Sequence, residues 1–537
     1  MTRRRPARRP GLLPLLAGLS AAASAAWATP DDVLVMARNL DAISTFDPAQ
    51  IGEVVTDEII QNTCDALVDV DPENEAAVVP RLAESWSVSE DGLTITFELA
   101  PDAVFPSGNP VTAEDAAWSL RRVLELGLGN AATLTEYGFT AESAEEAFVA
   151  AGPHTLEMRL DRPYPIDLIL QAIAANRVAA VLDRETILAE EVDGDLGNQF
   201  LGTNTACVGP YSLRQWNAGD VVVLEANETY HGEAPAIPRW IIRHVPEAGA
   251  QRLLLEQGDI DVARDLGAEN LGALEGAEGV RVESTPKHQL FYMGFDSGQE
   301  RFADPRVRLA FKHLLDYAGL ADTVMAYDGM PRASVVPIGA VGALDEEEGQ
   351  PFSLDLERAR ALLEEAGYGE GFEARLFIGN STPYAAPIAQ HVQANAAEVG
   401  IDLRIEQMAD AQLFSAFRGR DFDTIMLSWS TSVPHAHGML SRHAVNPDNS
   451  EEAALTMYPT WRASWQDEEF NRRVEEALFE TDEARQLEMY AELQRDHMEA
   501  GPFAYLFQIV DTAGVSEEVM AWPWNAFRVY YDQVAKE

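Results

Sequence analysis

Two histidines lie one residue apart in a stretch of this chain that contains no acidic residue. The stretch reads WSTSVPHAHGML over residues 429–440, with His435 and His437 inside it and His443 shortly after it. Neutral imidazole nitrogens are good ligands for nickel, copper or zinc. Because residues i and i+2 of an extended loop point in opposite directions, at most one or two of these rings could meet one ion. Two interpretations stay open: a metal site, or histidines that bond the backbone and help to form a ligand pocket without metal.

A strand must position this stretch. FDTIMLSW at 422–429 is a short apolar run typical of a buried strand, so the histidine stretch is predicted to be the loop that leaves its carboxyl end. In open α/β sheets, ligands are met at the carboxyl ends of the strands. Trp429, at the end of this strand, is therefore predicted either to contact a ligand or to belong to the core.

Two further strand ends carry candidate residues. A predicted strand over 33–37 is followed by Arg38 and Asp41, and Tyr384 begins the helix after a predicted strand over 374–378. Arg38 could instead pair with a surface acid, and Tyr384 could serve packing. All three are candidates for ligand contact on the grounds of position.

Strand and helix patterns alternate in both halves of the chain. Residues 93–99 alternate apolar and polar side chains, Thr112 and Asp115 form a capping pattern before a helix, and Asp355 caps a helix in the second half. The pattern predicts an α/β protein of two lobes. Because no flexible linker separates the lobes, we expect strands near 281–296 and 501–512 to cross between them and act as hinges.

The N-terminus has the pattern of a secretory signal peptide. Residues 1–28 contain five arginines, then an apolar run, and end on the small-x-small pattern Ala26-Trp27-Ala28. A membrane anchor is the alternative, but Pro14 and many small residues interrupt the run, which falls short of the ~20 apolar residues of a spanning helix. The residue directly after the cleavage site is Thr29 rather than a cysteine that could accept a lipid. We expect cleavage after Ala28, no lipid anchor and a periplasmic protein, exported by the Sec or the Tat route.

The chain is strongly acidic. Its formal net charge is −49, and removal of the five arginines in residues 1–28 makes it −54. This charge excludes nucleic acid as a partner, because phosphate would be repelled. Salt screens such self-repulsion, so the composition predicts an acidic, halophilic protein, with an ordinary acidic periplasmic protein as the alternative.

The chain has two cysteines, Cys64 and Cys207. In an oxidising compartment they could form a disulfide that closes a loop of about 140 residues and contributes up to ~4 to 5 kcal/mol by the chain-entropy argument. Two separate thiols are the alternative, because sequence does not show proximity.

Several ordered stretches carry a family resemblance. They are residues 62–67, 80–115, 207–213, 221–263, 302–317, 355–368 and 422–429, which include NTCDAL, CVGPYSL and FDTIMLSW. Through them the chain resembles, over essentially its whole mature length, the extracellular solute-binding proteins of family 5. These are the peptide, oligopeptide and nickel receptors of ABC importers.

The resemblance implies a two-lobed α/β periplasmic binding protein of the class II, cluster C type, with the ligand cleft between the lobes. It implies these boundaries: signal peptide 1–28; lobe I from 29–70, 200–283 and 506–537; an inserted subdomain 71–199; and lobe II 284–505. Both cysteines then fall in lobe I, which favours the disulfide. The ligand would bridge the lobes and shift an open–closed equilibrium rather than undergo a reaction.

The resemblance also bears on the ligand. In the peptide receptors of this family, an aspartate three residues after the strand-end tryptophan holds the ligand's ammonium group, and here that position is Ser432. Residues 376–403 also lack the arginine that holds the peptide carboxylate in dipeptide receptors. Nickel receptors of the family place histidine in this region. Two ligand classes stay open: a peptide or peptide-like small solute, with Ser432 among its contacts, and a nickel or other metal chelate held by His435, His437 or His443.

Enzyme motifs are absent. The sequence has no Gly-x-Ser-x-Gly, His-Glu-x-x-His, GxxxxGK[ST] or strand-following GxGxxG, so we expect no catalysis, no resident metal and no cofactor. A periplasmic chaperone, a chemosensory binding protein and, more remotely, a hydrolase are the alternatives to an import receptor. The expected partners are a small-molecule or short-peptide ligand and the ABC permease and ATPase complex, bound by a monomer.

Overall fold

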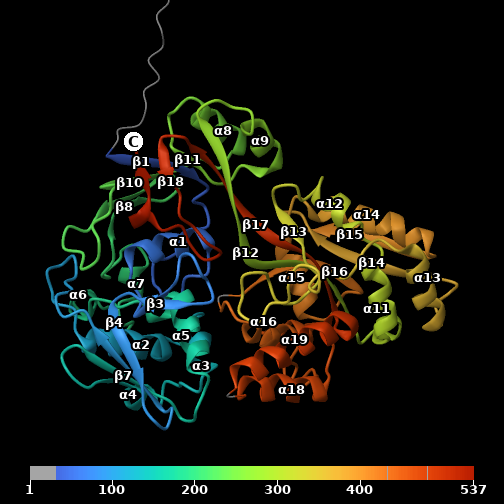
Figure 1. Ribbon diagram of the computed structural model, residues 1–537, viewed down its shortest axis with the longest axis horizontal. Helices are drawn as coiled ribbons and strands as arrows, with labels where there is room; N and C mark the ends of the chain where they lie inside the picture. The colour runs from blue at the N-terminus through green and yellow to red at the C-terminus, as the bar shows by residue number, and fades with distance from the viewer. Residues whose placement is uncertain (1–31, 432, 481) are drawn as a thin grey trace, which may run out of the picture.

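The computed structural model describes residues 32–431, 433–480 and 482–537. The predicted signal peptide 1–28 and the candidate Ser432 therefore lie outside the described residues. Figure 1 shows the first half of the chain on one side of the molecule, most of the second half on the other, and β12 and β17 between them.

One long mixed sheet runs through both halves. Among the described residues its strand order is β15 (Ile401–Met408), β14 (Phe372–Gly379), β16 (Thr424–Ser430), β12 (Val280–Phe295), β17 (Phe503–Ser516), β11 (Val262–Ala263), β1 (Val33–Arg38), β10 (Arg239–His244), β9 (Val221–Ala226) and β8 (Tyr211–Asn217), with β13 (Gly329–Pro331) beside β17. The pairs β1–β10, β1–β11, β14–β15 and β14–β16 are parallel.

The strands β12 and β17 join the two halves, as predicted for these segments. Their antiparallel pairing extends from Val280 to Gly294 and is interrupted by a register shift between Pro286 and Leu290. The buried amide of Gln508 replaces the missing ladder bonds there: its Nε2 donates to the carbonyl of Lys287 at 3.0 Å, and its Oε1 accepts from the Ile338 backbone N–H at 2.7 Å. The sheet is thus continuous but irregular at the crossing.

Smaller sheets accompany the first half. They are β4 (Ala83–Val88), β5 (Thr94–Leu99), β7 (Thr155–Arg159) and β6 (Phe148–Ala150) in one sheet, and the pairs β2 (Val68–Val70) with β3 (Val78–Pro80) and β18 (Val519–Ala521) with β19 (Ala535–Lys536). The helix α2 (Ala113–Leu126) packs beside β6 and β7. Its predicted cap is confirmed: the Thr112 side chain accepts from the Asp115 N–H and the Asp115 side chain accepts from the Thr112 N–H.

The remaining helices cover the sheets. In the first half they are α1 (Val54–Thr63), α3 (Ala131–Thr135), α4 (Ala144–Ala147), α5 (Ile166–Ala175), α6 (Arg184–Ala189), α7 (Asn198–Leu201), α8 (Ala248–Glu256), α9 (Gly267–Leu274) and the 3-10 turn η1 (Arg177–Ala179). In the second half they are α10 (Glu300–Ala303), α11 (Pro305–Lys312), α12 (Tyr317–Ala321), α13 (Leu356–Glu365), α14 (Ala385–Glu398), α15 (Asp410–Arg418), α16 (Ala436–His443), α17 (Pro459–Arg462), α18 (Glu468–Leu478), α19 (Glu483–Ala500) and the 3-10 turn η2 (Tyr531–Gln533). The predicted Asp355 cap of α13 is confirmed.

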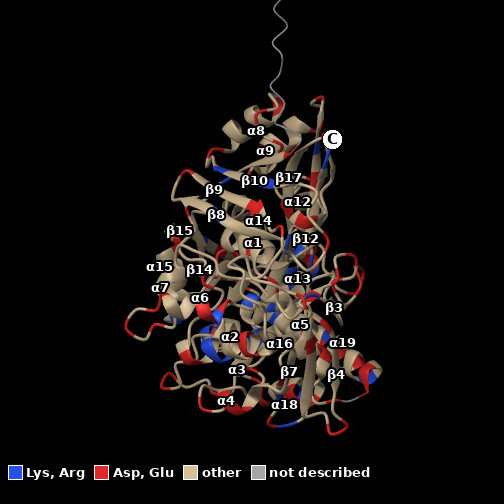
Figure 2. Cartoon of the chain, turned by 90° about the vertical axis from the view of Figure 1, so that its left-hand side faces the viewer, with Lys and Arg blue, Asp and Glu red and all other residues tan. Residues whose placement is uncertain are grey.

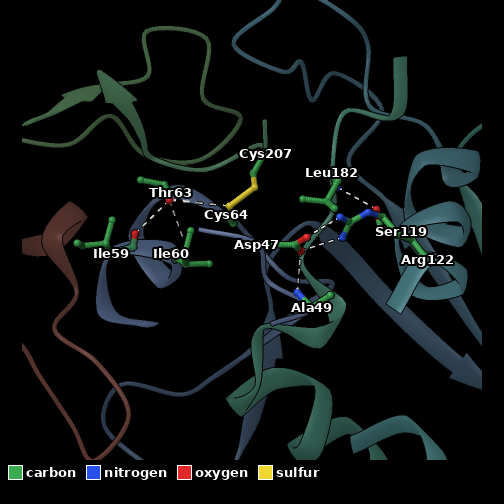
Figure 3. Close-up of a disulfide and its surroundings, with 10 residues drawn as sticks. All are labelled: Asp47, Ala49, Ile59, Ile60, Thr63, Cys64, Ser119, Arg122, Leu182 and Cys207. Carbon is green, nitrogen blue, oxygen red and sulfur yellow. Dashed lines mark hydrogen bonds and ion pairs between the residues drawn. A yellow bond between two sulfur atoms is a disulfide. The ribbon is translucent and has the colours of Figure 1, made fainter. Parts of the chain in front are cut away.

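One disulfide and one buried ion pair link separate segments of the first half (Figure 3). Cys64, at the end of α1, and Cys207 form a disulfide, with their Cα atoms 4.9 Å apart. Beside it, the guanidinium of Arg122 on α2 donates to both carboxylate oxygens of Asp47, and neither side chain is exposed. The disulfide links the end of α1 to the segment before β8, and the ion pair links α2 to the segment before α1.

Charge is distributed over the whole surface. In Figure 2, red segments of Asp and Glu outnumber blue segments of Lys and Arg and are scattered over loops and helices rather than gathered in one patch. Several of the basic residues are buried, among them Arg122, Arg264 and Arg528, each in a salt bridge. Each of these pairs buries one acid with one base, so the net negative charge stays on the surface.

Candidate functional site

A pocket of about 210 Å³ opens where β16 ends and faces the first half of the chain. Trp429, the second-last residue of β16, lines it together with residues from α3 and from α16. The complete lining is Gly129, Asn130, Ala132, Thr133, Glu136, Tyr137, Asn176, Trp429, Ser430, Thr431, Val433, Gly438, Arg442 and Met457. The pocket is thus enclosed by residues from both halves, and Trp429 is one of its walls.

The histidine stretch is not a loop throughout, so this part of the prediction is wrong. The helix α16 begins at Ala436, and His435 is its N-cap, with Nδ1 accepting the His437 backbone N–H at 3.0 Å. This bond satisfies one of the free N–H groups of the first helical turn, the task usually performed by Ser, Thr, Asp or Asn. The residues on either side of His435 are Pro434 and Ala436, neither of which has a side-chain acceptor.

Each candidate histidine has its own set of partners. His435 packs against the Tyr490 ring, His437 Nδ1 lies 3.1 Å from the Tyr490 hydroxyl, and His443 Nδ1 lies 3.0 Å from the Tyr505 hydroxyl. Burial lowers the pKa of His435 to about 3 and that of His437 to about 4, and it holds the pKa of His443 well below its usual range. The rings are neutral at physiological pH.

The histidines do not converge on one point. In the described part of the chain, no group of three or more His, Cys, Asp or Glu side chains is placed to hold a metal ion. His443 lies behind the pocket, with the ring of Trp429 against its own at 5.0 Å between centroids. His435 instead lines a second, wider pocket of about 590 Å³, formed by residues 162–168, 479–480, 483 and 486.

Glu136 and Arg442 meet across the smaller pocket. Arg442 Nη2 donates to Glu136 Oε2 at 3.0 Å, and the Ser441 hydroxyl donates to Glu136 Oε1 at 3.2 Å. Both ionised side chains are 24% exposed. His437 Nε2 lies 4.0 Å from Glu136 Oε1, beyond hydrogen-bond distance. A carboxylate from the first half thus faces a cation and a hydroxyl from the second.

Short elements hold these groups in place. Glu136 follows α3, which is fixed by Asn130, whose Nδ2 donates to the carbonyls of Pro48 at 2.7 Å and Ile51 at 3.1 Å. On the other side, α16 approaches the loop after β16 closely at Gly438. A Cβ there would lie 2.9 Å from the Thr431 Oγ1 and 3.0 Å from the Val433 carbonyl oxygen. Glycine therefore allows α16 to bring Ser441 and Arg442 to the pocket.

The other candidates lie elsewhere. Arg38 is buried and donates to Glu58 at 2.6 Å, and Asp41 is largely exposed, 3.5 Å from His244. Tyr384 precedes α14 and packs edge-on against Phe291. None of the three is among the residues that line the pocket of Trp429.

Glu136, Arg442 and Gly438 were not predicted as site residues from the sequence. In a chain with 88 acidic residues, one glutamate carries no signal of its own. Its pairing with Arg442 joins positions 306 residues apart, so neither residue's neighbours in the sequence indicate the contact. The sequence shows Gly438 but does not show the close approach to Thr431 and Val433 that requires a glycine there.

Comparisons with known proteins agree on one family. The family described as "Bacterial extracellular solute-binding proteins, family 5 Middle" matches residues 77–451. A probable D,D-dipeptide-binding periplasmic protein of Escherichia coli (strain K12) is 26% identical over 502 residues, covering 93% of this chain and 92% of the relative. The glutathione-binding protein of the same strain is 26% identical over 443 residues, covering 81% of each chain.

Solved structures agree on the fold. HbpA2 from Haemophilus parasuis matches with a TM-score of 0.79 at 20% identity, covering 94% of this chain and 100% of that one. The chain therefore has the two-lobed α/β fold of the periplasmic binding proteins. Within the described residues, no helix is both long enough and apolar enough to cross a membrane.

Proposed function

The chain belongs to the family 5 bacterial extracellular solute-binding proteins, and from this premise we propose that it captures a peptide or peptide-like solute between its lobes and delivers it to an ABC importer. Members of this family are binding proteins. Binding without chemical conversion of the ligand is therefore part of the proposal. Relatives named for D,D-dipeptide and glutathione binding support the peptide-like class.

The observation that carries the proposal is the pocket with walls from both halves of the chain. Trp429, Thr431 and Arg442 come from the second half, and Asn130, Thr133 and Glu136 from the first. A solute held there contacts both lobes, so its binding energy favours the closed arrangement over the open one. An indole wall with polar neighbours is typical of sites that hold small polar solutes.

The proposal divides the chain at the crossing strands. We assign lobe I to 29–70, 200–283 and 506–537, the inserted subdomain to 71–199 and lobe II to 284–505. The register shift in β12 and the single amide of Gln508 that replaces its ladder bonds support a hinge there. Closure would bend β12 and β17 at this irregular point rather than break a regular ladder.

The proposal also includes export to the periplasm. Residues 1–28 carry the signal-peptide pattern, and one relative, the probable D,D-dipeptide-binding protein of Escherichia coli, is named as a periplasmic protein. The intact mass of the protein recovered from the periplasm tests this part directly. A mass that begins at Thr29 supports cleavage after Ala28, and a mass that retains the five N-terminal arginines contradicts it.

Titration calorimetry with a panel of di- and tripeptides tests the binding function. We expect at least one peptide to bind, and Trp429→Ala to weaken its binding by roughly tenfold or more, because an aromatic wall of the pocket is lost. Trp86→Ala is the matched control, since Trp86 is another partly buried tryptophan, on β4 and not among the pocket residues. Equal affinities of the two variants, or no binding by any peptide, would overturn the proposal.

A further inference from the structure

The pocket of about 210 Å³ is lined by one acidic and one basic side chain. Among its described lining residues, Glu136 and Arg442 are the charged ones, and the others are apolar, amide, hydroxyl, indole or glycine residues. The pair therefore sets the electrostatic character of the pocket. A solute with a single uncompensated charge would find only one of its two partners, whereas a solute with both charges would find both.

The two charges belong to opposite lobes of the proposed division. Glu136 follows α3 in the inserted subdomain, and Arg442 is in α16 of lobe II. Opening of the lobes would separate them, and closing around a solute would place the solute's charges between them. In the structure described here the two groups contact each other directly at 3.0 Å.

This contact is exchangeable. Both side chains are 24% exposed, so water reaches the pair and its net contribution is modest. Ser441 continues to donate to Glu136 when Arg442 is displaced, because it bonds the other carboxylate oxygen. Burial keeps the neighbouring His437 ring neutral, with its pKa lowered to about 4, so His437 adds no competing cation.

The separation of Glu136 and Arg442 and the volume of the pocket narrow the class of solute that could bind. Glu136 and Arg442 lie in contact, so the smallest separation that admits a solute between them suits one whose ammonium and carboxylate are close together. In an α-amino-acid head group both are attached to one carbon. In a linear α-linked peptide they are at least one residue apart. The pocket of about 210 Å³ has room for a single amino-acid group rather than a long peptide.

We propose that Glu136 and Arg442 exchange their mutual contact for an α-amino-acid head group, with the solute's ammonium on Glu136 and its carboxylate on Arg442. This inference rests on the proposed solute-binding function and names the ligand class of the same pocket. Side-chain-linked peptides carry such a head group intact, since their peptide bond uses a different carboxyl group. The solute then bridges the lobes through two charge-assisted contacts.

Two isomeric peptides test the inference on the unaltered protein. In γ-glutamyl-alanine the ammonium and one carboxylate share a carbon, whereas in α-glutamyl-alanine the peptide bond uses that carboxyl group. The isomers have the same composition, mass and formal charge. We expect calorimetry to show the γ isomer binding about tenfold or more tightly, because two charged contacts replace one.

Variants of Glu136 and Arg442 test which of the two residues contacts which charge of the solute. E136Q keeps the size of the side chain, and R442Q removes the charge and shortens the side chain. Each variant is expected to weaken binding of the γ isomer by roughly tenfold or more. N-acetylation of the γ isomer removes its ammonium, so the acetylated peptide should bind wild type and E136Q alike. Thermal melting of each variant in the absence of ligand controls for folding.

Two outcomes overturn the inference in different ways. Equal binding of the isomers, or preference for the α isomer, contradicts the head-group assignment and leaves the solute-binding function in place. No binding by either isomer or by any peptide of the wider panel contradicts the solute-binding proposal itself, and the assignment with it.

Discussion

Two properties of His435, its N-cap bond and its lowered pKa, predict that the folded state loses stability as the pH falls. His435 caps α16 through Nδ1, and this bond requires an unprotonated nitrogen. Burial, together with the nearby His437, lowers its pKa to about 3 from an ordinary value of 6.5. Between these values the unfolded chain binds a proton at this residue and the folded chain does not. Stability is therefore full above pH 6.5 and is lost as the pH falls.

His435→Asn tests this linkage, because asparagine is a good N-cap that does not titrate. We expect the free energy of unfolding of the wild type to fall by about 2 kcal/mol more than that of the variant between about pH 7 and pH 5. Urea denaturation at several pH values measures this. Parallel pH profiles for the two proteins would show that His435 is not protected from protonation by the fold.

The buried Arg122–Asp47 pair links α2 to the segment that precedes α1. Asp47→Asn leaves the buried guanidinium without its carboxylate, so we expect a loss of roughly 3 to 5 kcal/mol in the free energy of unfolding. Glu488→Gln, in the exposed pair with Arg485 on α19, is the control and should cause no measurable loss. Similar stabilities of the two variants would contradict the structural role of the buried pair.

At the scale of elements, the packing of α16 on the loop after β16 determines where the pocket residues lie. Gly438→Ala introduces a Cβ within 3.0 Å of Thr431 and Val433, so we expect a loss of about 1 to 3 kcal/mol in stability. Peptide affinity should fall as well, because α16 carries Arg442. Gly249→Ala in α8 is the matched control, since a Cβ there meets nothing within 4 Å and alanine favours helix. A harmless Gly438→Ala would disprove the close contact.

Many of these helices and strands could be predicted from the sequence. Local patterns predicted the strands β1, β5, β14 and β16, the caps at Thr112 and Asp355, and the crossing strands β12 and β17. These features depend on neighbouring residues and on hydrophobic period. The start of α16 was missed because histidine is an uncommon N-cap, and the assignment of residues 429–440 to a loop followed from that.

The residues that line the pocket were predicted less well than the helices and strands. Trp429, predicted from its place at the end of a strand, lines the pocket, and its contact with a ligand stays a prediction. Arg38 and Asp41 end β1 by the same rule, yet Arg38 pairs with Glu58 and Asp41 faces outward. Which charged residues are neutralised internally depends on long-range contacts, such as the one between Glu136 and Arg442. Sequence proximity carries no information about those contacts.

At the scale of the whole molecule, the acidic surface predicts a response to salt. The charge after removal of residues 1–28 is −54, and the acids are spread over the surface (Figure 2). We propose a halophilic adaptation, in which salt screens the mutual repulsion of these charges. The melting temperature should rise by about 5 °C or more between about 0.1 M and 2 M NaCl. A melting temperature that stays constant or falls would point to an ordinary acidic protein.

Solute capture between two lobes is the central claim, and native mass spectrometry of protein isolated from the periplasm without unfolding tests it most directly. We expect a bound mass that fits a short peptide or an amino-acid-containing solute, and we expect it to be lost from the Glu136→Gln variant. A bound mass containing a transition metal, retained by Glu136→Gln and lost on substitution of His435 or His437, would contradict the account.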